Sequence, residues 1–130
     1  MRYVGIRAVV VGFFALCALM PGVTRAAWNQ PVAGSLNVSM SQDGFNPQMA
    51  DVGGVPYVAW TEMNAGGEEV YVKRFDGGAW TQVGGSLNVV ATDGTGLPSI
   101  ANVGGVPYVV WDESNGTADE IYVKRFDGSA

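Results

Sequence analysis

The chain contains two copies of one sequence unit, and this internal repeat limits the folds open to it more than any other feature. Residues 34–38, Gly-Ser-Leu-Asn-Val, return as residues 85–89. Aligned at an offset of 51 positions, residues 34–79 and 85–130 are identical at 26 of 46 positions without a gap. A repeat of about this length does not bury its own apolar face, so we expect both copies to share one backbone and to pack on neighbouring repeats.

The first 26 residues are predicted to be a signal peptide. Arg2 and Arg7 precede an apolar run from Ala8 to Met20, and a small-residue site at Thr24 to Ala27 follows. An apolar run of 13 residues is short of the roughly 20 that a bilayer span needs, so we expect cleavage after Ala26 or one residue later. An uncleaved N-terminal anchor is the alternative. With cleavage, no membrane span is expected, and the protein is predicted to be secreted, periplasmic or at the cell surface.

Composition excludes several kinds of chemistry from the mature chain. The only cysteine, Cys17, lies inside the signal peptide, and the chain has no histidine. Disulfides, cysteine nucleophiles and cysteine-bound metals are therefore excluded, and the commonest general base is missing. Removal of residues 1–26 leaves four Lys and Arg against twelve Asp and Glu, so the net charge changes from −5 to −8. We expect no nucleic-acid partner for so acidic a domain, and we expect no metal and no cofactor.

The mature region, residues 27–130, is predicted to be all-β. Glycine is frequent, and apolar residues alternate along the chain instead of recurring at helical spacing. In the first copy we expect strands at residues 47–52, 55–61, 69–75 and 79–83, joined by a turn at Gly53-Gly54, a loop at 62–68 and a turn at Asp76-Gly77. Four short antiparallel strands in about 50 residues match the size of one β-propeller blade.

The order of short motifs resembles a known repeat family. Gly-Gly-x-Pro-Tyr-Val at 53–58, x-Val-Tyr-Val at 69–72 and Trp-x-x-Val at 80–83 are similar to a kelch-type blade, and more closely to tandem blade repeats of about 50 residues in secreted bacterial proteins. Where kelch repeats carry a glycine pair, this chain has Ala59-Trp60. The resemblance implies four-stranded antiparallel β-propeller blades in two repeats, 34–84 and 85–130, which form an incomplete propeller.

Two blades do not close a ring, because closure takes at least about four. The second copy stops in mid-repeat, and residues 28–32 parallel residues 80–84, with Trp28 in the place of Trp80. Two explanations are open. The chain is the N-terminal fragment of a longer propeller, or it is complete and assembles head to tail. In the second case the Trp28 segment completes the last blade of a neighbour, and three chains form a homotrimer of six blades.

Comparison of the two copies separates a constant scaffold from variable loops. Residues 39–46 differ from 90–97 almost throughout, and 61–68 differ from 112–119 at most positions. Repeat proteins place specificity in such loops. We therefore predict that the chain is an exported binding or structural scaffold whose partner is a glycan or another surface protein.

Two aromatic-acid pairs are the candidate ligand-binding residues: Trp60 with Glu62, and Trp111 with Glu113. The aromatic face would stack on sugar CH groups while the carboxylate accepts hydrogen bonds from hydroxyls. The alternative is that these tryptophans belong to the core between blades. No catalytic residue is predicted, because no carboxylate pair stands out and no histidine exists to activate a serine. The other hypothesis for function is the N-terminal part of a propeller-type hydrolase or lyase acting on polysaccharide.

Overall fold

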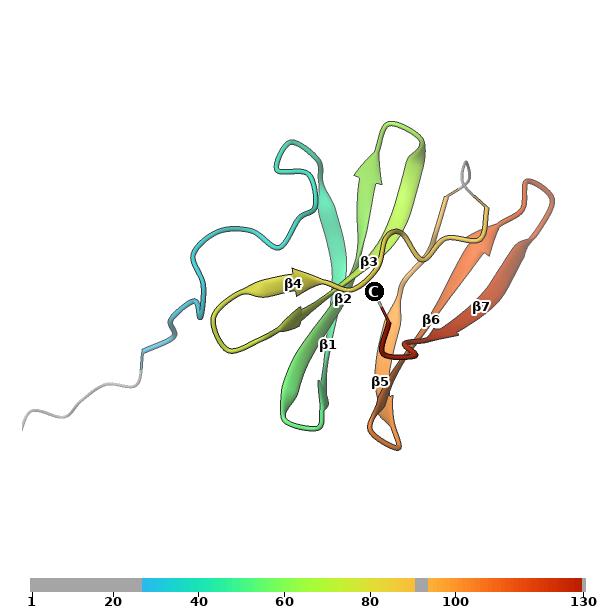
Figure 1. Ribbon diagram of the computed structural model, residues 1–130. Coiled ribbons are helices and arrows are strands. Elements are labelled where there is room, and N and C mark those ends of the chain that lie inside the picture. Colours follow the sequence, from blue (N-terminus) through green and yellow to red (C-terminus); the bar gives the residue numbers. More distant parts are fainter. Residues whose placement is uncertain (1–26, 91–93, 130) are drawn as a thin grey trace, which may run out of the picture.

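The computed structural model describes residues 27–90 and 94–129, which form two antiparallel β-sheets (Figure 1). The strands are β1 (Gly44–Val52), β2 (Val55–Asn64), β3 (Gly67–Phe75), β4 (Trp80–Gln82), β5 (Ser99–Val103), β6 (Val106–Ser114) and β7 (Asp119–Arg125). The first sheet has the order β1-β2-β3-β4 and the second the order β5-β6-β7. The described residues contain no helix, which confirms the all-β prediction.

Tight glycine turns connect the first two strands of each sheet, as the sequence predicted. Gly53 and Gly54 have φ values of 65° and 84°, and Gly104 and Gly105 repeat them at 62° and 83°. Side chains that carry a Cβ rarely adopt this backbone region, so glycine suits both turn positions. The Asp51 carboxylate accepts a hydrogen bond from the Gly54 N–H at 2.8 Å and holds the first turn closed.

The second and third strands are longer than predicted. Strand β2 continues to Asn64 and β3 begins at Gly67, so the loop expected at residues 62–68 is wrong and only a two-residue turn separates the strands. Strand β1 also begins early, at Gly44, because a bulge between Phe45 and Gln48 lets it pair with the extended part of β2. In the second sheet the expected loop is likewise shortened, since β6 runs to Ser114 and β7 begins at Asp119.

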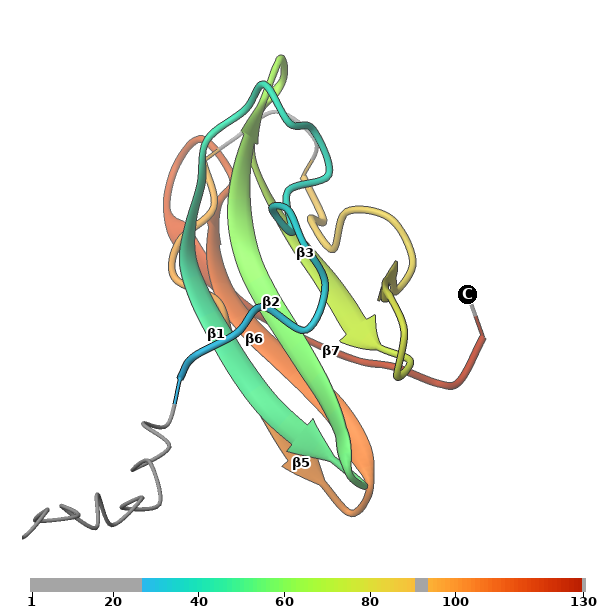
Figure 2. The same ribbon diagram turned by 90° about the vertical axis from the view of Figure 1, so that its left-hand side faces the viewer.

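The two sheets pack face to face, one behind the other in Figure 2. The residues of the shared core are Val52, Tyr57, Ala59, Val70 and Val72 from the first sheet, Ile100, Val109 and Trp111 from the second, and Val83 from the connection between them. Within β2, Tyr57 and Ala59 face the second sheet, whereas Val58 and Trp60 are buried on the opposite face. Strand β2 is therefore buried on both of its faces.

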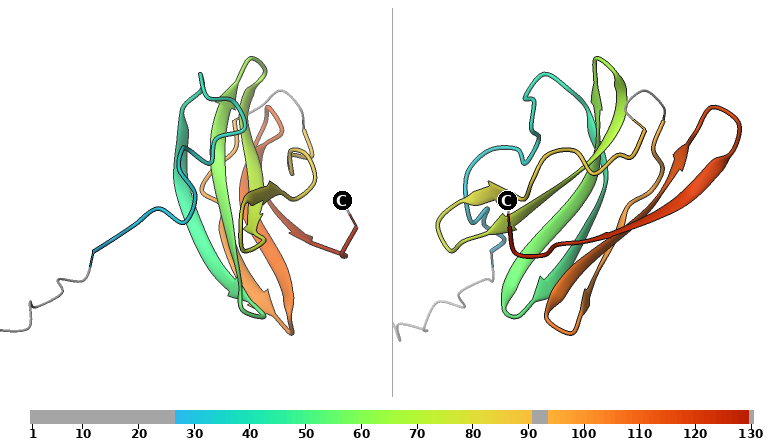
Figure 3. Two further views of the ribbon diagram at one scale, coloured as in Figure 1. Left: turned by 60° about the vertical axis from the view of Figure 1, so that its left-hand side comes forward. Right: turned by 45° about the vertical axis from the view of Figure 1, so that its right-hand side comes forward.

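The connection between the sheets continues along the edge of the first sheet before it leaves it. After β4, the Val83 N–H donates to the Val72 carbonyl and the Leu87 N–H donates to the Val70 carbonyl, both at 2.9 Å. The Asn88 amide then occupies two further edge positions: its Oδ1 accepts from the Val70 N–H at 3.0 Å and its Nδ2 donates to the Glu68 carbonyl at 2.8 Å. The chain next crosses to the second sheet (Figure 3).

Candidate functional site

Trp60 and Glu62, two of the four candidate ligand-binding residues, form one buried site with the chain that precedes β1. They lie two positions apart on β2 and therefore on the same face. The Trp60 Nε1–H donates to Glu62 Oε2 at 2.9 Å. The backbone N–H groups of Val38 and Ser39 donate to Oε2 and Oε1 at 2.8 and 2.6 Å. Three N–H donors therefore balance a carboxylate that is only 1% exposed.

The second repeat builds the same site with Trp111 and Glu113 on β6. The Trp111 Nε1–H donates to Glu113 Oε2 at 2.8 Å. The Val89 N–H lies 3.0 Å from both carboxylate oxygens, and the Val90 N–H donates to Oε1. Glu113 is fully buried. The arrangement is repeated although the two loops that it holds differ in sequence.

A lysine and a tyrosine cover each tryptophan. Lys73 Nζ lies 5.8 Å from the centroid of the Trp60 ring, and Lys124 Nζ lies 5.9 Å from that of Trp111. At this range an ammonium is attracted to the face of an indole. The ring of Tyr71 packs at a tilt against Trp60, with centroids 6.1 Å apart, and an equivalent tyrosine packs on Trp111.

The structure brings the predicted residues together as pairs, but it places them inside the protein. Trp60, Glu62, Trp111 and Glu113 are all buried, and their polar atoms are hydrogen-bonded within the chain. The expected loop position of the two glutamates is wrong, because both lie on strands. Direct contact of these side chains with a ligand stays a prediction. In this structure each pair fixes the beginning of a variable loop, at Ser39 or at Val90.

The backbone donors of the site were not identified from the sequence. The donors are the backbone N–H groups of Val38, Ser39, Val89 and Val90. The side chains of these residues do not indicate this role. A signal was nevertheless present. Gly-Ser-Leu-Asn-Val is identical in both copies just before the variable loops, although it lies outside the strands.

The variable segments gather at one end of the two sheets, uppermost in Figure 1, which we call the loop end. It consists of residues 39–43, 65–66, 94–97 and 115–118. The Met63 N–H donates to the Asp43 carbonyl at 2.9 Å, and the Ser114 N–H donates to the Gly94 carbonyl at 3.1 Å. The loop before β1 therefore lies beside the end of β2, and the loop before β5 lies beside the end of β6. Met40 and Leu97 present exposed apolar side chains here.

A groove of about 530 Å³ lies between the sheets near the end of β7. Its lining is mostly apolar and includes Tyr57, Val72, Val109 and Phe126, together with the cations Lys124 and Arg125. Phe126 is the equivalent of Phe75, whose ring packs against Trp80 with centroids 5.4 Å apart. The groove therefore adjoins the part of the second sheet where the described chain has no counterpart of β4.

Four side chains have shifted pKa values: Asp76 and Asp127 at two Asp-Gly turns, and Tyr71 and Tyr122 on β3 and β7. The pKa of Asp76 is lowered because the N–H groups of Gly78 and Ala79 donate to its carboxylate. The pKa of Asp127 is lowered by hydrogen bonds from Ser129.

Both shifted tyrosines donate to glutamates. The pKa of Tyr71 is raised by burial and by its hydrogen bond to Glu69, and the pKa of Tyr122 is raised chiefly by its hydrogen bond to Glu120 at 2.7 Å. The four shifts come from hydrogen bonds within turns, from burial of Tyr71 and from contacts between neighbours on one face of a strand, and none of them marks a converging catalytic group.

Metal-binding and membrane-spanning features were sought in the described part of the chain. Residues 27–90 and 94–129 contain no group of three acidic, histidine or cysteine side chains that would hold a metal ion. Nor do they contain a helix long and apolar enough to cross a bilayer. The predicted signal peptide lies outside the described residues. Comparison with family models, curated proteins and solved structures finds no match to this chain.

Proposed function

We propose that this chain is an exported β-propeller repeat module that acts as a non-catalytic binding scaffold. Its partner is a glycan or a surface protein, which it engages at the loop end. One observation carries the proposal: the buried Glu62 and Glu113 sites are the same in both repeats, yet each holds the start of a loop that differs between them. A constant support with changed loops is the arrangement expected when loops set specificity.

The blade assignment is supported by the sheet geometry. The first sheet has four antiparallel strands joined in sequence order, and the second sheet packs on its face with an equivalent arrangement of three. A blade has four such strands and is covered by its neighbours on both faces. The apolar signal-like sequence at residues 8–20 supports export.

The test is a binding screen of the purified chain on a printed panel of bacterial and host cell-surface glycans. Binding of one glycan class is expected, and Met40→Ala or Leu97→Ala should weaken it, since both side chains are exposed in the variable loops. Thr81→Ala, exposed on β4 away from the loop end, is the matched control and should bind normally. Failure to bind any member of the panel contradicts the glycan version, and equal loss in all three variants contradicts the loop end as the site.

A further inference from the structure

The outer face of the second sheet is apolar and exposed, although its equivalent in the first sheet is buried. Val70 and Val72 on β3 are 0% and 4% exposed, whereas Ile121 and Val123, their equivalents on β7, are 70% and 59% exposed. The exposed apolar side chains on this face are Val103, Val110, Ile121 and Val123. Burial of such a face is strongly favourable, so its exposure marks a contact surface.

The first sheet shows what covers such a face. Its own Val70 and Val72 are covered by the face of the second sheet that carries Ile100 and Trp111. The corresponding face of the first sheet is its outer face, which points away from the second sheet. There Met49 is the equivalent of Ile100, and its side chain is exposed. One copy therefore carries both halves of the contact, on opposite sides of the molecule.

The outer edges of β3 and β7 also differ, since in the described part of the chain the first is paired and the second is open. The outer edge of β3 is occupied by β4 and then by Val83, Leu87 and the Asn88 amide. Among residues 27–90 and 94–129, no strand pairs with the outer edge of β7. An edge of this kind is a template for the backbone of another segment.

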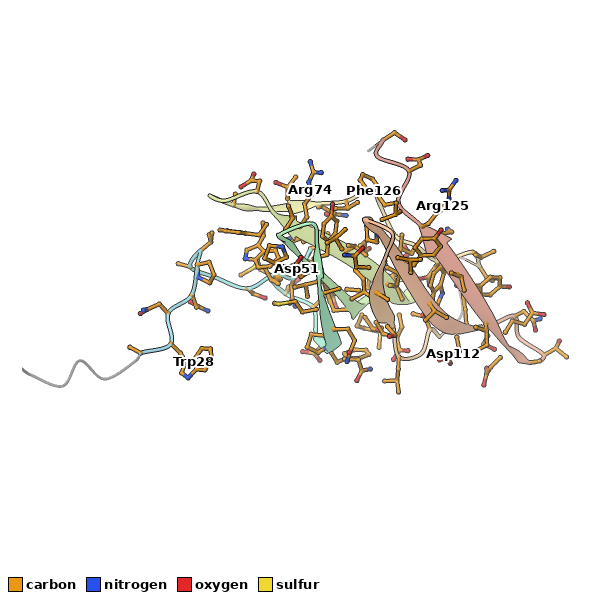
Figure 4. The ribbon with its side chains drawn as sticks, turned by 90° about the horizontal axis from the view of Figure 1, so that it is seen from below. Trp28, Asp51, Arg74, Asp112, Arg125 and Phe126 are labelled. Atoms are coloured by element: carbon orange, nitrogen blue, oxygen red, sulfur yellow. The ribbon has the colours of Figure 1, made fainter. Side chains whose placement is uncertain are left out.

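The segment that would fill the edge is present at the other end of the chain. Residues 28–37 correspond to residues 80–88 with one residue more, and they begin with Trp28 in the place of Trp80. Trp28 is 103% exposed and lies away from both sheets in Figure 4. Asn37, the equivalent of Asn88, donates to the Gln42 carbonyl instead of bridging a strand edge.

We propose that residues 28–37 of one copy add to the outer edge of β7 in a second copy of this chain, as residues 80–88 add to β3 within one copy. The same head-to-tail operation places the outer face of the first sheet of one copy on the exposed face of the second sheet of the other. Three unsatisfied features, the apolar face, the open edge and the detached Trp28 segment, are thus satisfied by one relationship.

The equivalence specifies the contacts. Trp28 packs on Phe126 of the second copy, as Trp80 packs on Phe75. Asn29 lies opposite Arg125, as Thr81 lies opposite Arg74. Figure 4 shows Arg125 and Phe126 next to each other near the end of the second sheet, on the side opposite to Asp112.

Asn37 then takes the role of Asn88 and exchanges its local partner for two backbone groups of β7. Its amide accepts from the Ile121 N–H and donates to the Asp119 carbonyl, by analogy with Val70 and Glu68. This inference stands apart from the proposed ligand binding, because it uses the strand edge and the outer sheet faces and not the loop end.

Disulfide trapping tests the register directly. The full chain would be produced in a host with an export pathway, in a Cys17→Ser background, and the mass of the purified chain would be recorded. The variant with Asn29→Cys and Arg125→Cys should give linked dimers and higher species under mild oxidation with copper phenanthroline. Separately tagged single variants, one with each cysteine, should form the mixed dimer when combined.

A matched pair inside one copy controls for geometry. Arg74→Cys with Thr81→Cys places thiols at the equivalent positions of β3 and β4, so an intrachain disulfide is expected there. If that control closes while the Asn29 and Arg125 cysteines stay free or join within one chain, the proposal is wrong. An intrachain link would mean that the Trp28 segment folds back on its own second sheet.

Light scattering provides the second measurement. The wild-type chain should have a mass that is a multiple of the chain mass, and Trp28→Ala should reduce it to the chain mass. Trp28 contacts neither sheet in the described chain, so this variant should fold normally, as judged by its circular dichroism. Ile121→Asp should have the same effect on mass. An unchanged mass in Trp28→Ala, or a wild-type chain that stays single at high concentration, overturns the proposal.

Discussion

The indole N–H of Trp60 donates to the carboxylate of Glu62 at 2.9 Å in the interior of the protein, and Trp111 and Glu113 repeat this contact at 2.8 Å. Each carboxylate also accepts backbone N–H groups from the chain that precedes the first strand of its sheet. The pair therefore joins a strand to a segment that is more than 20 residues away in the sequence.

Glu62→Gln should lower the free energy of unfolding by about 2–3 kcal/mol, because hydrogen bonds to a charged acceptor are lost and an amide NH₂ faces N–H donors. Urea unfolding measures the change, and Glu113→Gln should behave alike. Glu68→Gln is the control, since its carboxylate accepts no hydrogen bond within the described residues. Equal effects of Glu62→Gln and Glu68→Gln would contradict the structural role of the buried site.

Gly54→Ala should destabilise the fold by about 1 kcal/mol, because Gly54 has a φ of 84°, a value that residues with a Cβ rarely adopt. The space around an added Cβ is open, so the cost comes from backbone strain and not from a clash. Gly85→Ala is the matched change. Gly85 also has open space but does not have a positive φ, so the substitution should be neutral or slightly stabilising. Thermal unfolding of the two variants side by side measures the difference, and identical shifts would refute the explanation.

The lowered pKa of Asp76 predicts acid sensitivity of the β3–β4 turn. Between the folded and ordinary pKa values the unfolded chain binds more protons at this site, so Asp76 contributes stability above the ordinary pKa. That contribution is lost as the pH falls through the lowered value. A carboxyl NMR titration should show the lowered pKa directly. Asp76→Asn should flatten the acid limb of the stability profile, and an acid limb as steep as in the wild type would contradict the role of this carboxylate.

Trp80→Ala should cost about 2 kcal/mol of stability, because Trp80 is half-buried and packs on Phe75 at the edge of the first sheet. Trp28→Ala, measured in solution dilute enough to keep chains apart, should cost nothing, since Trp28 is fully exposed within one copy. Denaturant titration of both variants gives the comparison. A loss of stability in dilute Trp28→Ala would show that this residue packs within its own chain.

The repeat and its turn residues were sufficient to predict the all-β class, the order of the strands and the glycine hairpins, although not where β2 ends and β3 begins. The paired glutamates were misplaced, since a charged residue beyond a strand pattern normally signals a loop. Burial of Glu62 depends on N–H groups of Val38 and Ser39, and this contact exists only after the chain has folded back on itself. The bulge at Phe45 to Gln48 depends likewise on pairing with β2 and has no local signal beyond Asn46, whose φ is 55°.

The hydrogen bonds that hold Glu62 in the buried site of the first repeat all lie between residues 38 and 62, and none of them involves the second repeat. The opposite face of that sheet, with Tyr57, Val70 and Val72, packs against β5 and β6 and against the connection between the sheets. The two faces of the first sheet are therefore covered by different parts of the chain: residues that precede β1 hold one face, and the sheet of the next repeat packs on the other.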